Sequence, residues 1–537
     1  MTAKILDFIR QPHRPISATK FALLMSLANF ILYNVHVLLY AATTLDYLTL
    51  NGLLALATVI VVIFIVTAVV ILLLCVISRH LAKLFCMLAA LISSVALYFV
   101  LTYKAVLDKT MMSNVFNTNM MEASSYLHYK LVIYLIVLGV IPSLAIYKLR
   151  IVNYKRTVLL LQSFILVVLL FGWTYLNASR LLWVDKYSSR LGARIMPWSY
   201  IGNSLAFHQR NLATSTEQEL LPAGTLTNAP EKTVVILVIG EAARAINFSL
   251  YGYKRATNPL LLKNGAIALQ NAVSCSTYTT LSLRCILSHT EVDSPFSKQY
   301  EPLPSYLHRH GVDVIWRTNN WGEPPMKVNT YQRNNGLEKT CQGERCKFDE
   351  VLLHGLAERI KTSTHNKILV VIHHWGNHGP SYYTRYPKPF EVFQPVCKSV
   401  ELNQCTDDEL VNAYDNVVLY TDYFLAKAIG LLQDLNTSTV LIYVSDHGES
   451  LGEYGLYLHG TPYAVAPDVQ IEIPLIVWMS PEFRESQGIR AESVPQNPSH
   501  SHQNIFHSVL GAVNMQSEVY NERLDIFKVM SGGVQAN

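Results

Sequence analysis

Five long apolar stretches in the first third of the chain constrain its fold more than any other feature. They cover residues 20–42, 51–77, 81–103, 131–148 and 157–178. Each is about long enough to cross the ~30 Å hydrocarbon core of a bilayer as a helix. The second stretch has no polar face to turn towards water. The pattern therefore predicts five membrane spans, rather than buried helices of a soluble core or one cleaved signal peptide.

Lysine and arginine are distributed unevenly around these stretches. They lie before the first, between the second and third, and between the fourth and fifth, at Lys4, Arg10, Arg14, Lys20, Arg79, Lys83, Lys148, Arg150, Lys155 and Arg156. The loop between the first two stretches has Asp46 and neither lysine nor arginine. Because short basic loops stay in the cytoplasm, we expect a cytoplasmic N-terminus and place everything after the fifth stretch outside.

The cysteines give an independent indication of the compartment. Two of the eight, Cys75 and Cys86, lie in or beside the apolar stretches. The other six form three near pairs: Cys275 and Cys285, Cys341 and Cys346, Cys397 and Cys405. Near pairs are typical of disulfides in an oxidising compartment. No CxxC spacing occurs, which argues against a zinc knuckle, so we expect three disulfides.

The last part of the chain has the pattern of an α/β domain. Apolar strands are predicted at 233–239, 312–316, 367–372, 439–444 and 473–479, with helical segments between them, most clearly at 408–434. Continuous apolar strands separated by helices indicate a mainly parallel sheet sandwiched by helices.

These patterns divide the chain into three parts. We expect a transmembrane domain at 1–180 with an outer loop at 104–130, interfacial helices and a linker at 181–232, and the α/β domain at 233–537. The mixture of Trp and Tyr with Arg and Lys at 183–200 fits a segment lying on the membrane surface, and equally an ordinary exposed helix and loop.

Acidic and histidine side chains follow three of the predicted strands. They are Glu241 after the first, His373, His374 and His378 after the third, and Asp446 and His447 after the fourth. In a parallel sheet, ligands bind beyond the carboxyl ends of the strands. Taken singly, each residue has a plainer explanation, such as a capping Asp in a turn or a solvated His. Together they favour a metal site, because Glu, Asp and His are suitable zinc ligands.

Five motifs then occur in a characteristic order. They are VIGEAAR (238–244), SCSTYTTLSLRC (274–285), NHGP (377–380), SDHGES (445–450) and YLHGTP (457–462). With them, nearly the whole chain resembles the membrane phosphoethanolamine transferases that modify lipid A, the group that contains the mobile colistin resistance enzymes. This group belongs to the alkaline phosphatase and sulfatase superfamily.

The resemblance implies a catalytic zinc ion held by Glu241, Thr279, Asp446 and His447, with Thr279 also the nucleophile. The family usually reads Cys-Gly-Thr-Ser-Thr-Ala before a Val-Pro-Cys, and this chain departs from it at several positions. The choice of Thr279 over the adjacent Thr280 therefore rests on the spacing from Cys275. A lysine that the family carries after the second strand is not obvious in 318–327, where Lys327 is a weak match.

The resemblance also implies a second group of residues around the site. His378 and His459 would bind the phosphate or a second zinc ion, and His373 would line the same pocket. The Cys275–Cys285 disulfide would fix the nucleophile loop. In the predicted outer loop, Asn114, Thr118 and Glu122 would share one helix face and meet the ethanolamine headgroup. From spacing alone, the same three residues also fit a solvated stripe.

The function implied by the resemblance is transfer of phosphoethanolamine from phosphatidylethanolamine to lipid A or the lipopolysaccharide core. A phosphothreonine-type intermediate would carry the group, with one or two zinc ions as cofactor. The expected protein is a multi-pass monomer of the bacterial inner membrane with a periplasmic catalytic domain. Added ammonium groups would weaken the binding of polymyxin and other cationic peptides.

Three alternatives remain on the sequence alone. A phosphoglycerol transferase or another headgroup transferase would use the same chemistry on another surface glycan. A sulfatase fits less well, because the residues around Thr279 do not offer its C/S-x-P-x-R setting. A membrane-anchored sensor or transporter is disfavoured by the few ionisable residues in the spans. The mild net charge of +5 and the lack of a basic stripe with interleaved aromatics exclude a nucleic-acid partner.

Overall fold

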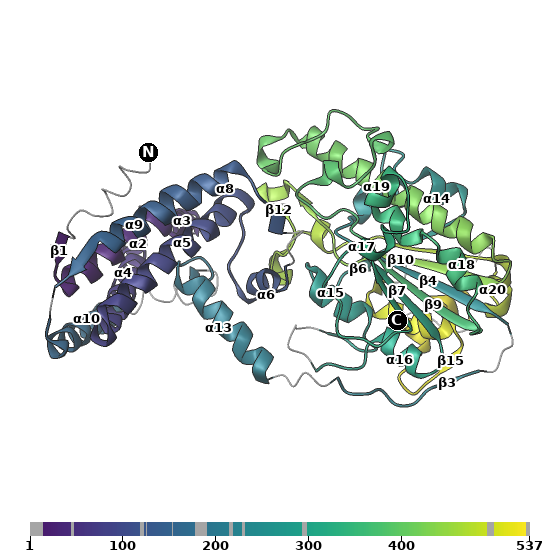
Figure 1. The fold of residues 1–537 in the computed structure, drawn as a ribbon, viewed down its shortest axis with the longest axis horizontal. Coiled ribbons are helices and arrows are strands. Elements are labelled where there is room, and N and C mark those ends of the chain that lie inside the picture. Colours follow the sequence, from purple (N-terminus) through teal and green to yellow (C-terminus); the bar gives the residue numbers. More distant parts are fainter. Residues whose placement is uncertain are drawn as a thin grey trace. The chain divides into compact units, whose positions relative to one another are not determined.

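The computed structural model describes residues 14–44, 48–118, 123–124, 126–152, 154–177, 191–213, 218–227, 231–292, 298–490 and 499–532. The chain divides into two compact units. The first contains Met1–Ser113 and Leu127–Gln209, and the second contains Asn114–Tyr126 and Arg210–Asn537. Each unit is described by itself below, with the labels of Figure 1. Much of the predicted interfacial segment at 183–200 lies outside the described residues.

All five predicted apolar stretches form helices in the first unit. The helices are α2 (Ala18–Tyr33), α3 (Val35–Thr44), α4 (Leu50–Ile77), α5 (Arg79–Tyr103), α8 (Tyr129–Tyr134) continued through η1 (Leu135–Val140) into α9 (Ile141–Lys148), and α10 (Arg156–Leu176). Within the described ranges, four helices are long and apolar enough to cross a membrane, and α2 with α3 makes a fifth if this bent pair is one span. The shorter helices α6 (Lys109–Asn117) and α13 (Trp198–Ala213) begin in this unit and end in residues of the second.

The first predicted span is not continuous, because the helix breaks at Asn34. α2 and α3 meet there at an angle of 55°. The buried Asn34 amide donates to the Met196 carbonyl at 2.8 Å and accepts from the Met196 amide at 2.9 Å. In an apolar interior every backbone polar group needs a partner. Asn34 supplies one for Met196.

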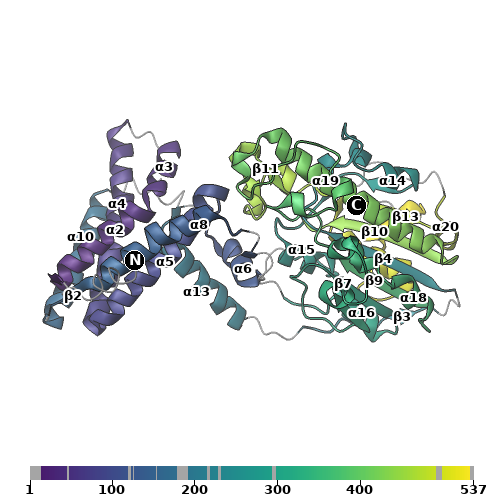
Figure 2. The same ribbon diagram turned by 45° about the horizontal axis from the view of Figure 1, so that its top comes forward.

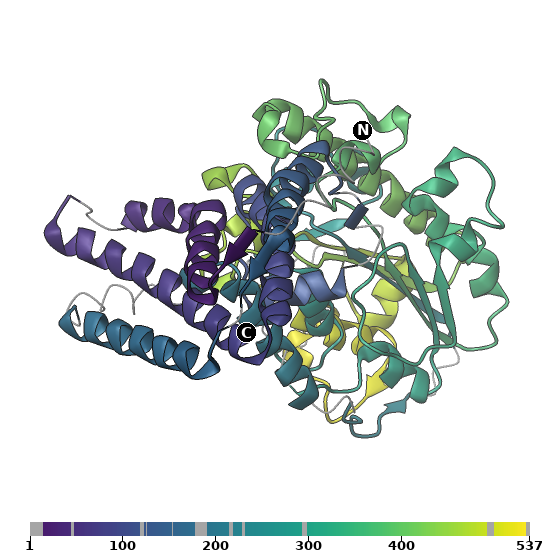
Figure 3. The same cartoon turned by 60° about the vertical axis from the view of Figure 1, so that its left-hand side comes forward.

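Three of the basic segments meet at one end of this unit. Strand β1 (Arg14–Ile16) pairs in parallel with β2 (Leu149–Ile151). Lys83 donates to the carbonyls of Tyr147 at 2.6 Å and Leu149 at 2.9 Å. Most helices of this unit are the purple and blue ribbons in Figure 3. The positive-inside rule expects the basic loops to lie on one side of a membrane, and their shared position at one end of the unit agrees with it.

The second unit is built on a seven-stranded sheet within the described part of the chain. Its order is β5 (Ile267–Leu269), β13 (Leu475–Met479), β10 (Ser438–Ser445), β4 (Thr233–Gly240), β9 (Lys367–His373), β7 (Asp313–Thr318) and β8 (Thr330–Arg333). The five strands from β10 to β8 are parallel, as predicted. β13 and β5 run antiparallel to their neighbours. β13 therefore does not add its carboxyl end to the edge where the other strands finish.

Helices cover both faces of this sheet, as predicted (Figures 1 and 2). The longest is α19 (Asp407–Gln433), whose N-terminus carries a capping box formed by Thr406 and Glu409. The other helices are α14 (Pro259–Lys263), α15 (Thr279–Ile286), α16 (Leu303–Arg309), α17 (Asn334–Leu337), α18 (Leu356–Lys361), α20 (Pro481–Gln487), α21 (Gln503–Ala512) and α22 (Ile526–Met530). Short strand pairs are β3 (Thr225–Leu226) with β15 (Met515–Gln516), β6 (Ala272–Val273) with β14 (His500–Ser501), and β11 (Ser450–Leu451) with β12 (Tyr457–Leu458).

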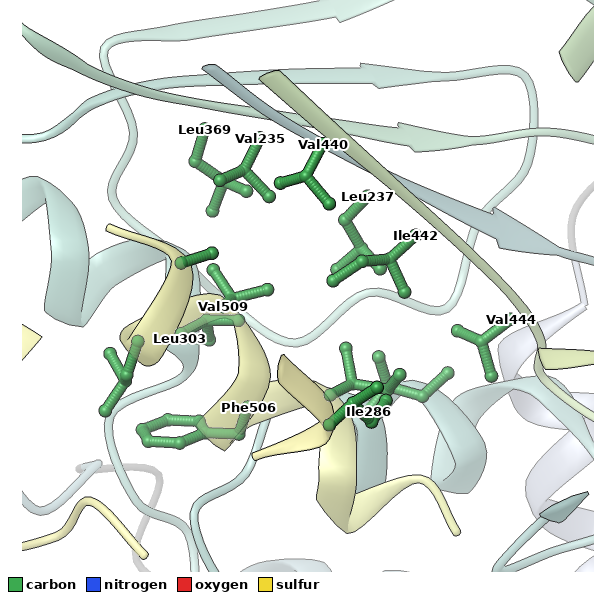
Figure 4. Close-up of a cluster of buried hydrophobic side chains, with 14 of the residues drawn as sticks. Val235, Leu237, Ile286, Leu303, Leu369, Val440, Ile442, Val444, Phe506 and Val509 are labelled. Carbon is green, nitrogen blue, oxygen red and sulfur yellow. The ribbon is translucent and has the colours of Figure 1, made fainter. Parts of the chain in front are cut away.

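One face of the sheet anchors the helix that begins at Thr279. Side chains of β4, β9 and β10 pack with those of α15, α16 and α21 in one buried cluster (Figure 4). Within it, Leu283 and Ile286 of α15 are fully buried. The Cys275–Cys285 disulfide joins the loop before α15 to the end of the same helix. The Cys341–Cys346 and Cys397–Cys405 disulfides are also formed, so all three predicted pairs are confirmed.

We expect Ile286→Ala to lower the free energy of unfolding by about 2–5 kcal/mol, because it opens a cavity in a fully buried cluster. Thermal unfolding of the purified protein in detergent would measure the effect. The control is Leu262→Ala, since Leu262 is 70% exposed and its loss should change stability by less than about 0.5 kcal/mol. Equal effects of the two changes would contradict this account of how α15 is anchored.

Candidate active site

The register of the parallel strands brings the predicted residues together. Gly240 at the end of β4 pairs with Ser445 at the end of β10, and Ile239 pairs with His373 at the end of β9. The next residues along β4 and β10 are Glu241 and Asp446. Because these strands end at the same level, their following loops converge on one edge of the sheet.

Glu241, Asp446 and His447 form a compact, fully buried cluster. One potential ligand atom from each lies within 4.8 Å of the other two. His447 Nε2 is 3.2 Å from Glu241 Oε1 and 3.3 Å from Asp446 Oδ2. Asp446 Oδ1 accepts from the amides of Ala242 and His447, whereas Oδ2 has no hydrogen-bond partner among the described residues. Two buried carboxylates with an unsatisfied oxygen suit a bound cation.

The shifted pKa values of these three residues also indicate that the cluster suits a bound cation. Burial and the adjacent charge of Glu241 raise the pKa of Asp446 well above its ordinary value. Burial raises the pKa of Glu241, but the hydrogen bond from His447 and the charges of nearby histidines outweigh it and hold this pKa well below its usual range. Burial lowers the pKa of His447, but the two carboxylates outweigh it and raise this pKa to about 10. A metal ion would replace the proton held among these groups.

The backbone orients His447 and strains its surroundings. His447 Nδ1 lies 2.8 Å from the Gly448 carbonyl, which only accepts, so Nδ1 carries a proton and Nε2, which faces the two carboxylates, is the nitrogen that a cation would take. Ala242 has a φ of 52°, a left-handed conformation unusual for alanine. Its amide donates to Asp446 Oδ1 at 3.0 Å, which places this backbone strain directly at the cluster.

Thr279 is the hydroxyl that faces this cluster. Its Oγ1 lies 3.2 Å from Glu241 Oε2 and 3.5 Å from His447 Nε2. Thr279 is buried and is the first residue of α15. The γ-methyl groups of Thr280 and Thr279 both lie beside Gly322, 3.1 and 3.6 Å from where a Cβ on that glycine would stand. Of these two hydroxyl groups, both in the described part of the chain, only that of Thr279 contacts the cluster. The structure therefore brings Thr279, rather than Thr280, to the three charged residues.

A second group of side chains borders the first. Glu241, His378 and His459 again offer three ligand atoms within 4.8 Å of one another. His459 Nδ1 lies 2.8 Å from Glu449 Oε2, and His378 Nδ1 lies 2.7 Å from the Gly379 carbonyl. In both imidazoles the opposite nitrogen, Nε2, then has the lone pair. Glu241 belongs to both groups, so it would lie between two ions or between an ion and a phosphate.

Other predicted residues have different positions. His373 ends β9 but packs against Trp316, with 6.4 Å between ring centroids, and its two ring nitrogens contact no hydrogen-bond partner in the described ranges. Its pairing with Ile239 puts His373 on the face of the sheet that carries α15, and Glu241 acts on it through its charge, but it makes no hydrogen bond to the cluster residues. Asn114 lies near the motif of His459, because a Cβ on Gly460 would be 3.4 Å from its Nδ2. Thr118 bonds back to the Asn114 carbonyl, and Glu122 lies outside the described residues.

Two site residues were not anticipated from the sequence. Asn320, in the loop after β7, donates from Nδ2 to Glu241 Oε2 at 2.7 Å. Asp349 is fully buried and accepts from Asn319 Nδ2 and from the Trp375 and Gly376 amides at 2.9, 2.9 and 3.0 Å. Its only sequence signal was an acidic residue near a cysteine pair, which is common on surfaces.

Asp349 holds the loop that carries His378 against Glu241. Gly376 in this loop has a φ of 48°, and a Cβ on it would lie 3.1 Å from the Glu241 carbonyl oxygen. The Asn377 amide donates to that same carbonyl at 3.0 Å. The close approach requires glycine, and the two amide bonds to Asp349 fix the turn that makes it.

The site therefore combines a group of potential metal ligands with a threonine hydroxyl, on a sulfatase-like fold. The family model described as "Phosphoethanolamine transferase EptA/EptB" matches residues 63–212, and the sulfatase model matches residues 233–515. The chain is 38% identical over 526 residues to phosphoethanolamine transferase EptA of Helicobacter pylori, covering 96% of this chain and 97% of the relative. It is 32% identical to phosphatidylethanolamine transferase Mcr-1 of Escherichia coli, covering 86% and 90%.

The fold agrees with a solved structure over nearly its whole length. The integral membrane lipooligosaccharide phosphoethanolamine transferase A of Neisseria meningitidis matches with a TM-score of 0.87 and 28% identity, covering 96% of this chain and 99% of that one. The chain belongs to the EptA/EptB phosphoethanolamine transferase family. It is therefore an enzyme, and the sensor and transporter alternatives are set aside.

We expect Asp349→Asn to lower the melting temperature at pH 7, because an amide cannot accept all the donors that the carboxylate accepts. Burial raises the pKa of Asp349, but hydrogen bonds from His374, Trp375 and Asn319 outweigh it and lower this pKa to about 2. A lowered pKa stabilises the fold above the unfolded value near 3.8 and loses this effect as the pH falls towards 2. The difference from wild type should therefore narrow between pH 4 and pH 2. A difference in melting temperature between wild type and Asp349→Asn that stayed constant from pH 7 to pH 2 would contradict this role of the Asp349 carboxylate.

Proposed function

We propose that this enzyme transfers phosphoethanolamine from phosphatidylethanolamine to lipid A, with Thr279 as the covalent carrier and zinc as the cofactor. The observation that carries the proposal is the position of Thr279 Oγ1, within 3.5 Å of both a carboxylate and an imidazole of the buried cluster. One relative, Mcr-1, is a phosphatidylethanolamine transferase, and another, from Escherichia coli, is a Kdo(2)-lipid A phosphoethanolamine 7''-transferase, which supports the donor and the chemical class of the acceptor.

The donor set fits zinc. Two carboxylates, an imidazole nitrogen and a hydroxyl converge from β4, β10 and α15, and zinc accepts oxygen and nitrogen ligands in tetrahedral sites. Glu241, Asp446, His447 and Thr279 would hold the ion. When bound, zinc would lower the pKa of the threonine hydroxyl and offset negative charge on the phosphoryl group. A second zinc ion or the phosphate itself would lie against His378 and His459.

The reaction then needs two displacements at phosphorus. First, Thr279 Oγ1, which lies 3.2 Å from Glu241 Oε2, gives up its proton and forms a bond to the phosphorus of the donor. The bond from phosphorus to the diacylglycerol oxygen breaks, and that oxygen takes up the proton that Thr279 released, so diacylglycerol leaves as a neutral alcohol. Second, an oxygen of lipid A attacks the same phosphorus, and the bond to Thr279 Oγ1 breaks. Hydrogen bonds donated by the site to the phosphoryl oxygens would lower the barrier of both steps, because negative charge builds up on these oxygens in each transition state.

The location follows from the same proposal. The basic segments at one end of the first unit support a cytoplasmic N-terminus. The three disulfides support a periplasmic second unit. Both substrates are lipids of the membrane, so an enzyme anchored there meets them without extracting them into water. Asn114 and Thr118, in the segment beside the His459 motif, would face the ethanolamine headgroup.

We expect Thr279→Ala to abolish formation of a covalent phosphoethanolamine adduct, a loss of at least about a thousandfold in rate, since the nucleophile itself is removed. Intact-mass and peptide mass spectrometry after incubation with phosphatidylethanolamine would detect the adduct on the peptide between Cys275 and Cys285. Thr280→Ala is the matched control and should form it. An adduct in Thr279→Ala, or its loss in Thr280→Ala alone, would overturn the assignment of the nucleophile.

Expression in a polymyxin-sensitive bacterium should add phosphoethanolamine to lipid A. Each added ammonium removes about one net negative charge, which is worth about 1 kcal/mol to a cationic peptide at the membrane surface, or roughly fivefold in affinity. Mass spectrometry of lipid A and peptide susceptibility would be measured together, with Thr279→Ala as the inactive control. If lipid A is unmodified but a core sugar carries phosphoethanolamine, the acceptor is the core and the proposed reaction still holds. If no part of the lipopolysaccharide is modified, the proposal is contradicted.

A further inference from the structure

Arg385 is a buried arginine beside the active site. Its side chain is 9% exposed. Its Nε donates to the His378 carbonyl at 2.9 Å, and its guanidinium lies over the Trp375 ring with 3.8 Å from Cζ to the ring centroid. Within the described ranges it makes no ion pair. Its two contacts fix the plane of the guanidinium and leave the terminal Nη groups without a carboxylate.

The neighbouring carboxylates are already engaged. Asp349 and Glu241 both act on Arg385 through their charge without contacting it. The oxygens of Asp349 accept from Asn319 and from two backbone amides. Glu241 accepts from Asn320 and faces the metal cluster. Neither carboxylate is available to neutralise the guanidinium directly.

Three other arginines of the second unit are ion-paired, and the buried Arg317, which has no ion pair among the described residues, donates from Nη1 to the carbonyls of Leu352 and His354. Arg244 pairs with Glu453 at 2.8 Å, Arg359 with Asp313 at 2.9 Å, and Arg255 with Asp415 at 2.9 Å. Arg255 also lies over an aromatic ring, that of Phe393 at 5.2 Å. A charge taken out of water without a partner is costly. The cost is offset when an anion binds.

We propose that Arg385 binds a phosphate group of a lipid substrate in the active site. The planar fork of a guanidinium matches two phosphate oxygens, and Arg385 is held in plane before any ligand arrives. Its bond to the backbone of His378 places this cation next to a residue that lines the reaction centre. This inference rests on the proposed function, which supplies two phosphate-bearing lipids.

The phosphate has two possible sources, the phosphodiester of the donor and the phosphate of the acceptor. The two half-reactions distinguish them. If Arg385 holds the donor, its loss slows formation of the adduct on Thr279 from phosphatidylethanolamine. If it holds the acceptor, the adduct forms at the wild-type rate, and only its transfer to a phosphate-bearing acceptor slows.

The test uses the full-length, zinc-loaded protein in detergent and inorganic phosphate as the probe, with binding measured by calorimetry. Arg385→Gln should raise the dissociation constant for phosphate by at least about tenfold, since a charge-assisted, bidentate contact is lost. Arg385→Lys keeps the charge but not the planar pair of donors, so its dissociation constant for phosphate should lie between those of wild type and Arg385→Gln. The control, Arg255→Gln, removes an arginine that also lies over a ring but is ion-paired, and should bind phosphate as wild type does.

The result that would overturn the inference is phosphate binding by Arg385→Gln within about twofold of wild type. A second result would also overturn the inference: both half-reactions are slow in Arg385→Gln, phosphate affinity is unchanged, and Arg385→Lys does not restore the rates. Arg385 would then only position the loop through its hydrogen bond to the His378 carbonyl. If the wild type formed no adduct while phosphate affinity still fell in Arg385→Gln, the proposed transfer would fail and the anion site would stand.

Discussion

Two buried carboxylates, Glu241 and Asp446, stand against one imidazole at the edge of the sheet, and the rest of the second unit depends on this arrangement. Like charges repel strongly in a dry interior. The fold keeps both groups there by giving each several donors: Asn320 and His447 for Glu241, and the Ala242 and His447 amides for Asp446. The left-handed φ of Ala242 is a strained detail that this arrangement requires. A cation at the centre would remove the repulsion.

The surrounding elements hold other groups at this centre with matching precision. α15 is fixed at its far end by buried Leu283 and Ile286 and by the Cys275–Cys285 disulfide, so that its first residue, Thr279, faces the cluster. Asp349 fixes the turn at Gly376 that brings His378 close. Neither anchor belongs to the cluster itself. Each removes conformational freedom from a residue that faces the cluster, Thr279 in one case and His378 in the other, which is how a preorganised site is built.

Much of this could be predicted from the sequence, because the signals were local. Apolar runs of membrane length and β-branched runs of strand length gave the helices and the core strands, and the residues after β4 and β10 proved to meet. Other features carried no local signal. The apolar run of β13 has no mark of direction, so its antiparallel course depends on tertiary packing. The helix break at Asn34 depends on Met196, which is 162 residues away. Of two adjacent histidines, His373 packs against Trp316 and His374 stacks on Phe424, a difference that nothing in the local sequence marks.

The anchors and Arg385 show the same limit at the site. Asn320, Asp349 and Arg385 come from three segments that are far apart in the sequence, and each residue type is common in surface loops. Their roles follow from burial and from contacts that only the folded chain creates. The neighbouring residues Thr279 and Thr280 are the clearest example, because one step along a helix decides which hydroxyl reaches Glu241 and His447.

The most direct test of this account is a crystallographic measurement of anomalous scattering at the zinc absorption edge on the wild-type protein. The account predicts a peak about 2.0–2.2 Å from oxygen and nitrogen atoms of Glu241, Asp446, His447 and Thr279. Absence of a peak among these four residues in crystals grown with zinc, or a peak bound only elsewhere, would contradict the central claim that they form the metal centre.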